Sequence, residues 1–511
     1  MNGAESVLRT LADSGVTVCF ANPGTSEMHL VAALDRVPGV RGVLTLFEGV
    51  ASGAADGYAR MAGGPAATLL HLGPGFGNAF ANVHNAYKGR TPLVNLVGDH
   101  AVAHKPLGAP LASDVESVVR PASDWVRTVR DARSAARDTA EAVAAARCGA
   151  VATLIVPADA GWEESLGPVA PAPVPALPAV PTEAVEACAR ALRQGGAALL
   201  LGGAATSARG LDLAARIAAA TGATLLRDTF AARLARGGAR PRPLGVPYLT
   251  EPAVDALKAF SSLVLVDTQR PVGFFAYPGQ PSLLADPSTS VLALAAPGED
   301  ALGALEDLAS ALDAPASVSV SALERVALPS GGALNVDNLS AVVGALLPDD
   351  AVVVDEAVTA SVMFVERLAG AGEHDHLFLT GGSIGWGMPA ATGAAVGAPG
   401  RPVVNLEADG SAMYTIQSLW TQAREGLDVT TIIIANRSYA ILEFEFSRVG
   451  AEGDGKAARE LMDIGRPELS FAGLASSMGV PGRRVDDVPG MVSALREAFS
   501  EPGPHLIEAV V

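Results

Sequence analysis

Short apolar runs alternate along the chain with longer stretches in which apolar and small residues recur at helical spacing. Runs at 67–70, 93–97, 151–156 and 262–266 are of the first kind, and the stretch 4–14 is of the second. Apolar runs of this length between helical patterns are typical of parallel strands buried on both faces of a sheet. The pattern predicts an α/β fold built from doubly wound parallel sheets.

The alternation falls into three blocks, which we expect to be three domains. The first covers 1–165, a proline-rich linker follows at 166–181, and the second covers 182–328. The third covers 335–511 and closes on a predicted strand at 505–510. Proline-rich segments are extended and semi-rigid, so the linker should lie on the surface. Two similar outer blocks around a Rossmann-like middle one suggest a duplicated architecture.

Composition excludes several classes of protein. Hydrophobic residues make up 49% of the 511 residues, and the formal net charge of −18 argues against a nucleic-acid surface. No uninterrupted apolar run reaches the roughly 18 residues of a membrane span, and the N-terminus carries no signal segment. The cysteines form no metal-binding pattern, which is typical of a reducing compartment. We therefore expect a cytoplasmic protein without membrane or nucleic-acid partners.

Two apolar runs in the third block end in oxygen-bearing side chains. Asp409 begins Asp-Gly-Ser, and Asn436 begins Asn-Arg-Ser. A carboxylate, an amide oxygen and a backbone carbonyl suit Mg²⁺, which completes its shell with phosphate and water. Gly410 would let the backbone approach a phosphate. Together the two motifs predict a site for thiamine diphosphate and Mg²⁺.

Glu48 follows an apolar run at 43–47 and precedes a helix of small residues. Taken alone, it fits a carboxylate stabilised by the dipole at a helix N-terminus. Beside a thiamine site in the third block, a catalytic role becomes the favoured interpretation.

With these motifs, the whole chain resembles the thiamine-diphosphate-dependent 2-oxo acid decarboxylases and carboligases. This superfamily includes acetolactate synthase, pyruvate oxidase and benzoylformate decarboxylase, and the motifs lie nearest to the last. The helix after Glu48 resembles the family's glutamate helix in its pyrimidine-binding domain, and 380–391 resembles the loop that props the cofactor. The resemblance implies that 1–165 binds the pyrimidine and 335–511 the diphosphate.

The resemblance also implies roles for individual residues. Glu48 would hydrogen-bond the aminopyrimidine, Ile384 would support the bent cofactor, and the Gly382 carbonyl would hold its amino group. Plain core packing at Ile384 is compatible with that support. Thr359 could equally be a helix cap. The implied ligands of the metal are Asp409, Asn436 and the carbonyl of Ser438, and the implied phosphate contacts are Gly410, Ser411, Thr359 and Tyr439.

On the substrate side, Thr25 and His71 match a serine and a histidine of benzoylformate decarboxylase, which makes both expected catalytic residues beside Glu48. His71 is either structural or an acid–base group, and we favour the second. The second histidine of that enzyme is missing from 271–280, which leaves His100 and His104 as the candidates to replace it. The expected pocket residues are Ile441, Leu442, Phe274 and His100. Glu445 either faces the substrate or is a solvated helix residue, and we favour the solvated position.

The leading hypothesis is decarboxylation of a 2-oxo acid, with possible addition of the product to an aldehyde. The alternatives are an acetolactate-synthase-type carboligase and a degenerate relative that only binds the cofactor. Gly202-Gly203 in the middle block could begin a dinucleotide-binding fold, but without GxGxxG a packing role for these glycines is favoured. The arginine-glycine pattern of flavin-binding relatives is absent, so FAD is not expected. The resemblance implies a homodimer at minimum and favours a homotetramer.

Overall fold

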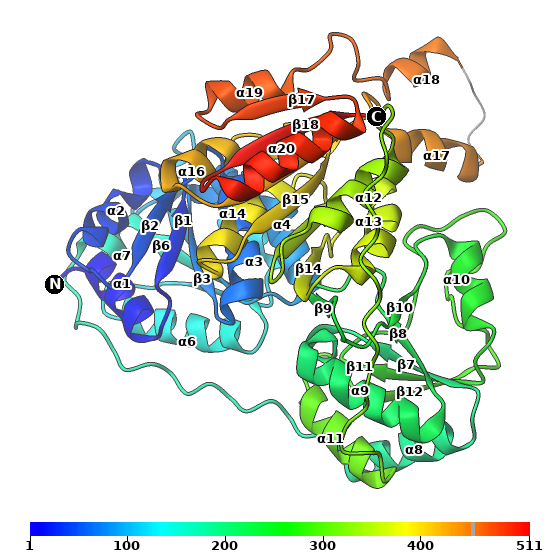
Figure 1. Ribbon diagram of the computed structural model, residues 1–511. Helices are drawn as coiled ribbons and strands as arrows, with labels where there is room; N and C mark the ends of the chain where they lie inside the picture. The colour runs from blue at the N-terminus through cyan, green and yellow to red at the C-terminus, as the bar shows by residue number, and fades with distance from the viewer. Residues whose placement is uncertain (451–454) are drawn as a thin grey trace.

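Three parallel sheets of six, five and seven strands organise the computed structural model, which describes residues 1–450 and 455–511. The expected α/β class with three sheet domains is confirmed. Figure 1 shows the first and third blocks side by side and the middle block below the third. Residues 165–181 contain no helix or strand and run as an extended trace from the first block to the second.

The first sheet has the order β2-β1-β3-β4-β6-β5, and all of its neighbouring strands are parallel. Every residue of β3, β4 and β6 is buried, which explains why their sequences are mostly apolar. The strands are β1 (Val18–Ala21), β2 (Arg41–Leu44), β3 (Ala66–Leu70), β4 (Leu93–Asp99), β5 (Trp125–Thr128) and β6 (Val151–Pro157). The helices are α1 (Gly3–Asp13), α2 (Met28–Leu34), α3 (Glu48–Ala62), α4 (Leu72–Gly89), α5 (Val115–Val119), α6 (Ala135–Arg147) and α7 (Ala158–Trp162).

The middle sheet has the order β10-β8-β7-β11-β12 and is parallel throughout. Its strands are β7 (Ala197–Leu201), β8 (Thr224–Arg227), β10 (Leu244–Gly245), β11 (Ser262–Val266) and β12 (Ser290–Ala295). Its helices are α8 (Thr182–Arg193), α9 (Ala208–Thr221), α10 (Thr250–Leu257) and α11 (Ala301–Ala311). The order reverses beside β7, as in other doubly wound sheets.

The third sheet has the order β17-β18-β16-β15-β13-β14-β9. Its strands from the third block are β13 (Val352–Glu356), β14 (His374–Phe378), β15 (Val403–Ala408), β16 (Val429–Ala435), β17 (Gly482–Val485) and β18 (His505–Val510). Its helices are α12 (Val336–Leu346), α13 (Ser361–Arg367), α14 (Gly387–Gly397), α15 (Asp409–Thr415), α16 (Ser418–Glu425), α17 (Ala440–Arg448), α18 (Lys456–Glu460), α19 (Phe471–Ser477) and α20 (Val488–Ser500).

The edge strand β9 (Leu234–Arg236) comes from the middle block yet pairs with β14 of the third. It is the antiparallel member of an otherwise parallel sheet. A segment of the middle block therefore completes the sheet of its neighbour through backbone hydrogen bonds, which the hydrophobic pattern does not predict.

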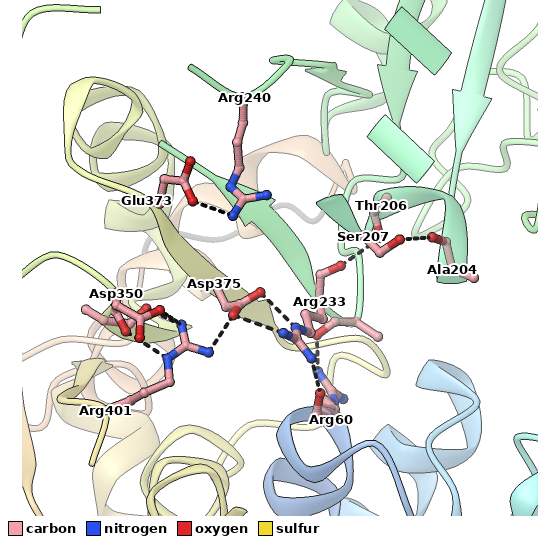
Figure 2. Close-up of polar contacts among 12 residues, drawn as sticks. Arg60, Ala204, Thr206, Ser207, Arg233, Arg240, Asp350, Glu373, Asp375 and Arg401 are labelled. Atoms are coloured by element: carbon pink, nitrogen blue, oxygen red, sulfur yellow. Dashed lines mark hydrogen bonds and ion pairs between the residues drawn. The ribbon is translucent and has the colours of Figure 1, made fainter. Parts of the chain in front are cut away.

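The three blocks meet at Arg233, immediately before β9. Its guanidinium donates to both carboxylate oxygens of Asp375 at 2.8 and 3.0 Å, and to the carbonyl of Arg60 at 3.1 Å. Arg401 donates to the same Asp375 at 2.8 Å. Figure 2 shows Asp375 between the two arginines, with Arg60 of the first block below them. Bidentate pairing orients the guanidinium in addition to the attraction between the two charges.

Helices α3 and α14 cross at very close range and join the first block to the third. A Cβ added at Gly57 would lie 2.0 Å from the carbonyl oxygen of Ala390, and one at Gly393 would lie 1.7 Å from that of Ala54. Only glycine permits this approach. The small residues that follow Glu48 in the sequence are therefore required by the packing of two helices.

Candidate active site

The diphosphate motifs of the third block gather around one pocket at the carboxyl ends of β13, β15 and β16. Ligands of open α/β sheets bind at this edge. The loops and helix starts that follow each strand supply the lining. Nine of the expected site residues line the pocket: Thr359, Ile384, Asp409, Gly410, Ser411, Asn436, Ser438, Tyr439 and Ile441. Leu442 is not among the lining residues and is 48% exposed.

The donor set of this pocket suits a hard cation. Asp409 opens α15, and its carboxylate accepts the N–H groups of Gly410 at 2.8 Å and Arg437 at 2.6 Å. Burial raises the pKa of Asp409, a cost that a bound cation would offset. The amide oxygen of Asn436 accepts the Ser438 N–H at 3.0 Å, which orients it. A carboxylate, an amide oxygen and the Ser438 carbonyl fit Mg²⁺, which takes few protein oxygens.

Gly410 makes room for an aromatic ring beside this set. A Cβ at position 410 would lie 2.4 Å from Cε1 of Tyr439. The ring of Tyr439 therefore packs directly against the backbone of Gly410 at the start of α15.

Glu356, at the end of β13, fixes the loop that carries Ile384. Its carboxylate accepts the N–H groups of Gly385 and Trp386, each at 2.7 Å, and also that of Gly387. The loop turns through Gly385, whose φ of +89° favours glycine. Burial raises the pKa of Glu356 to about 7. No motif marked this residue, although its place at a strand end is a signal that could have identified it.

Glu48 lies in the first turn of α3 and is 7% exposed. Its carboxylate accepts a hydrogen bond from Asn78 Nδ2 at 3.0 Å. It is not among the residues that line the diphosphate pocket of the same chain. One chain therefore presents the expected pyrimidine contact and the expected diphosphate contacts at separate places.

His71 is paired with a buried carboxylate that sequence reasoning missed. Its Nδ1 lies 2.8 Å from Oε2 of Glu27, which also accepts the Gly24 N–H at 3.1 Å. Burial raises the pKa of Glu27, and its interaction with His71 lowers it in part. The other oxygen, Oε1, packs over Gly98, where a Cβ would lie 1.7 Å away. The position of Glu27 at the end of the Asn22–Glu27 motif was the available signal.

The remaining first-block residues surround this pair. Thr25 is exposed on the 3-10 turn η1 (Thr25–Glu27), which also carries Glu27. His100 follows β4, next to the Gly98 that Glu27 covers. Its buried Nε2 has no partner within the part of the chain that the structure describes, and its ring lies 5.4 Å from that of His104.

Phe274 brings the middle block onto the loop of the third. A Cβ at Gly382 would lie 2.5 Å from Cζ of Phe274. The Phe274 ring also lies 5.3 Å from the ring of Tyr248 and 5.0 Å from that of Phe275. A cluster of aromatic rings from the middle block therefore lies beside Gly382.

The preference for a solvated Glu445 is wrong. Its carboxylate accepts a hydrogen bond from the hydroxyl of Tyr277 at 2.9 Å, and its Oε1 is buried. The aromatic loop of the middle block folds against α17 and covers it, which helical periodicity in α17 alone cannot reveal.

Comparison with known proteins supports the assignment of thiamine-diphosphate-binding domains to the first and third blocks. The model of the thiamine pyrophosphate enzyme N-terminal binding domain matches residues 1–117, and that of the C-terminal binding domain matches 357–509. Within residues 1–450 and 455–511, no helix is both long and apolar enough to cross a membrane.

Among individual proteins, one from Mycobacterium tuberculosis named "Putative acetolactate synthase large subunit IlvX" is 53% identical over 517 residues, covering 100% of this chain and 99% of its own. Benzoylformate decarboxylase of Pseudomonas aeruginosa is 29% identical over 97% of this chain and 96% of its own. The structure of a 4-hydroxybenzoylformate decarboxylase from Rhodococcus jostii superposes with a TM-score of 0.85 at 24% identity, covering 99% and 98% of the two chains. The chain is thus a member of the thiamine pyrophosphate enzyme family.

Proposed function

We propose that the protein binds thiamine diphosphate through Mg²⁺, decarboxylates a 2-oxo acid, and joins the remaining fragment to a second carbonyl compound. The observation that carries the proposal is the pocket in which Asp409, Asn436 and Ser438 meet. The 53% identical relative, whose printed name is an acetolactate synthase large subunit, supports the joining step.

Simple decarboxylation is the second candidate, and the pair formed by His71 and Glu27 favours it. A carboxylate on Nδ1 fixes the ring and leaves Nε2 available to exchange a proton. A group held in this way suits protonation of a product after carbon dioxide has left. The more distant benzoylformate decarboxylase relatives support this candidate.

Each assigned residue has a defined task in the proposal. The cofactor, when bound, supplies the electron sink for breaking the carbon–carbon bond. Glu48 would share a proton with the pyrimidine, and the Gly382 carbonyl would orient its amino group. Ile384 would support the bend between its two rings. Asp409, Asn436 and Ser438 would hold Mg²⁺, while Thr359, Gly410, Ser411 and Tyr439 would contact phosphate.

We further propose that two chains share each site. Glu48 lies outside the pocket that contains Asp409 in its own chain. A cofactor that touches both residues would then bridge one protomer and its partner, as expected for a two-fold dimer. Pairing of two such dimers into a tetramer belongs to the same proposal.

Product analysis tests the proposed reaction. Holoenzyme would be incubated with pyruvate or benzoylformate, with and without an added aldehyde, and all products would be identified. Carboligation predicts a new 2-hydroxy ketone or 2-hydroxy-2-methyl-3-oxo acid, whereas simple decarboxylation predicts an aldehyde. Asp409→Ala serves as the control that should lose both activities together with bound cofactor after gel filtration in chelator. Absence of turnover across a broad panel of 2-oxo acids would contradict the proposal and favour a protein that only binds the cofactor.

A further inference from the structure

Asp355, near the end of β13, holds the turn that follows this strand. Its buried carboxylate accepts two hydrogen bonds at Oδ1, from the Ala357 N–H at 3.1 Å and from the Ser361 hydroxyl at 2.6 Å. The two donors lie on either side of the 3-10 helix η5 (Val358–Ala360), and α13 begins directly after it. We call residues 357–361 the pocket turn, because four of them line the candidate pocket for the diphosphate.

The pocket turn contains a strained residue. Val358 lines the pocket and has a φ of +53°. A β-branched residue rarely adopts this left-handed conformation, which brings its Cβ too close to the backbone. Such a conformation persists only where the surrounding contacts impose it. The two hydrogen bonds to Asp355 are contacts of this kind, because they fix the backbone on both sides of Val358.

His376 of β14 holds the other oxygen of the same carboxylate. Its Nε2 lies 3.0 Å from Oδ2 of Asp355, and its Nδ1 lies 3.2 Å from Nη1 of Arg236. An arginine can only donate, so Nδ1 accepts, and Nε2 carries the proton that is donated to Asp355. Burial lowers the pKa of His376 to about 4, so the ring is neutral in this role. Burial alone would raise the pKa of Asp355, but the hydrogen bonds from His376 and Ser361 lower it, so the carboxylate stays charged.

Arg236 brings the middle block into this series of contacts. It is the last residue of β9, the strand of the middle block that pairs with β14 (Figure 1). Its guanidinium donates to His376 and also, at 2.6 Å, to the carbonyl of Val365 in α13. The same arginine therefore contacts the histidine behind the pocket turn and the helix that follows the turn. A continuous series of hydrogen bonds runs from the middle block to the pocket.

We propose that Arg236, His376 and Asp355 are positioning residues that hold the pocket turn, with Val358 in its left-handed conformation, ready for the diphosphate of the cofactor. This inference rests on the proposed function, which places the diphosphate against this turn. It extends that function to the middle block, because β9 then contributes to cofactor affinity without touching the cofactor. None of the three side chains lines the pocket itself.

Calorimetric binding of thiamine diphosphate with Mg²⁺ to the cofactor-free, full-length protein tests the inference. His376→Phe keeps an aromatic ring but removes the donor, and it should raise the Kd by about tenfold, as expected when a hydrogen bond to a charged group is lost. His376→Gln can still donate to Asp355 and should keep the Kd within about threefold of that of the unaltered protein. His374→Phe is the matched control, because His374 lies on the same strand but binds the carbonyl of Gly372. Its Kd should not change.

A double substitution separates positioning of the turn from a general structural role. Glycine adopts positive φ without strain, so Val358→Gly removes the strain that the contacts with Asp355 oppose. In combination with Val358→Gly, His376→Phe should raise the Kd by less than about threefold, against about tenfold without it. An equal rise in Kd with and without Val358→Gly would overturn the inference, as would an unchanged Kd in His376→Phe.

Hydrogen exchange of the pocket-turn amides in the cofactor-free protein gives a readout that needs no ligand. We expect exchange to be about tenfold faster in His376→Phe and unchanged in His374→Phe. Should His376→Phe fail to fold, Asp355→Asn replaces it, because an amide oxygen cannot accept from both His376 and the pocket turn. Should the unaltered protein bind no thiamine diphosphate, the proposed function fails separately. Exchange that stays slow in these variants would show that the turn holds its conformation without the three residues.

Discussion

At the scale of single residues, the candidate site depends on carboxylates that the chain holds in very different surroundings. Glu48 is held by an amide, Glu27 by an imidazole and Glu356 by backbone N–H groups. At Glu356 burial outweighs the N–H groups that stabilise its anion and raises its pKa, and at Glu27 burial likewise outweighs the interaction with His71. These surroundings assign different chemistry to residues of the same type.

We expect Glu48→Gln to slow exchange of the cofactor C2 proton by several orders of magnitude while leaving cofactor binding nearly intact. The amide can still contact the pyrimidine, but it cannot share a proton with it. Exchange would be followed by NMR of the bound cofactor, and binding by equilibrium titration. Exchange at the rate of the unaltered protein would show that Glu48 serves only as a helix N-terminal residue.

His71→Ala should reduce turnover by about 10²–10⁴, the range for loss of a general acid–base group, with little change in cofactor affinity. Glu27→Gln should shift the pH profile of kcat rather than abolish activity, because it removes the charge that orients the imidazole. Steady-state kinetics across pH check both variants. A change of less than about threefold in His71→Ala would mean that the ring only packs.

At the scale of elements, Glu356 connects a strand end to a loop and a helix. Its pKa of about 7 in the folded protein lies above its ordinary value of 4.5, so the folded state holds this proton more tightly than the unfolded state. Stability contributed by the protonated group is therefore complete below about pH 4.5 and is lost as the pH rises through about 7. Glu356→Gln should flatten this part of the profile of unfolding free energy against pH. Denaturant unfolding at intervals of about one pH unit, from about pH 4 to about pH 8, would measure it. An unchanged slope would contradict the assignment.

The crossing of α3 and α14 gives a second prediction at this scale. Gly57→Ala would force a Cβ to within 2.0 Å of the Ala390 carbonyl oxygen and should destabilise the protein by about 1–3 kcal/mol. Gly64→Ala is the matched control, since nothing lies within 4 Å of its added Cβ. Thermal unfolding of both variants separates the effect of packing from that of a general loss of glycine. Equal melting temperatures would mean that the helices move apart at little cost.

Most elements followed from hydrophobic periodicity, and the exceptions have physical causes. The strand expected at 505–510 matches β18, because four of its six residues are apolar and five are buried. In contrast, β9 is three residues long and ends in an arginine, so its own sequence does not predict a strand. It becomes a strand by pairing with β14, which lies far away in the sequence. Glu27 and Glu356 escaped notice because their partners lie 44 and 29 to 31 positions away. Motifs record neighbours in sequence, whereas these contacts arise only in three dimensions.

At the scale of the whole molecule, the separation of Glu48 from the Asp409 pocket predicts complementation between chains. Mixing Glu48→Gln with Asp409→Ala under conditions that exchange subunits should restore part of the activity. Each heterodimer would contain one site with both defects and one with neither. Subunit exchange would be verified with differently tagged chains. No recovery despite exchange would mean that both residues act on a cofactor held within a single chain.

Strand β9 belongs to the middle block but pairs into the sheet of the third block, and this limits how the protein can be divided into fragments. Because β9 is hydrogen-bonded into the third sheet and Arg233 holds Asp375 beside it, the middle block cannot be excised without cutting a sheet edge. Separately expressed fragments would each expose unpaired backbone groups, which promote aggregation. Under mechanical load applied to its ends, the middle block should yield together with the edge of the third sheet rather than as an independent unit.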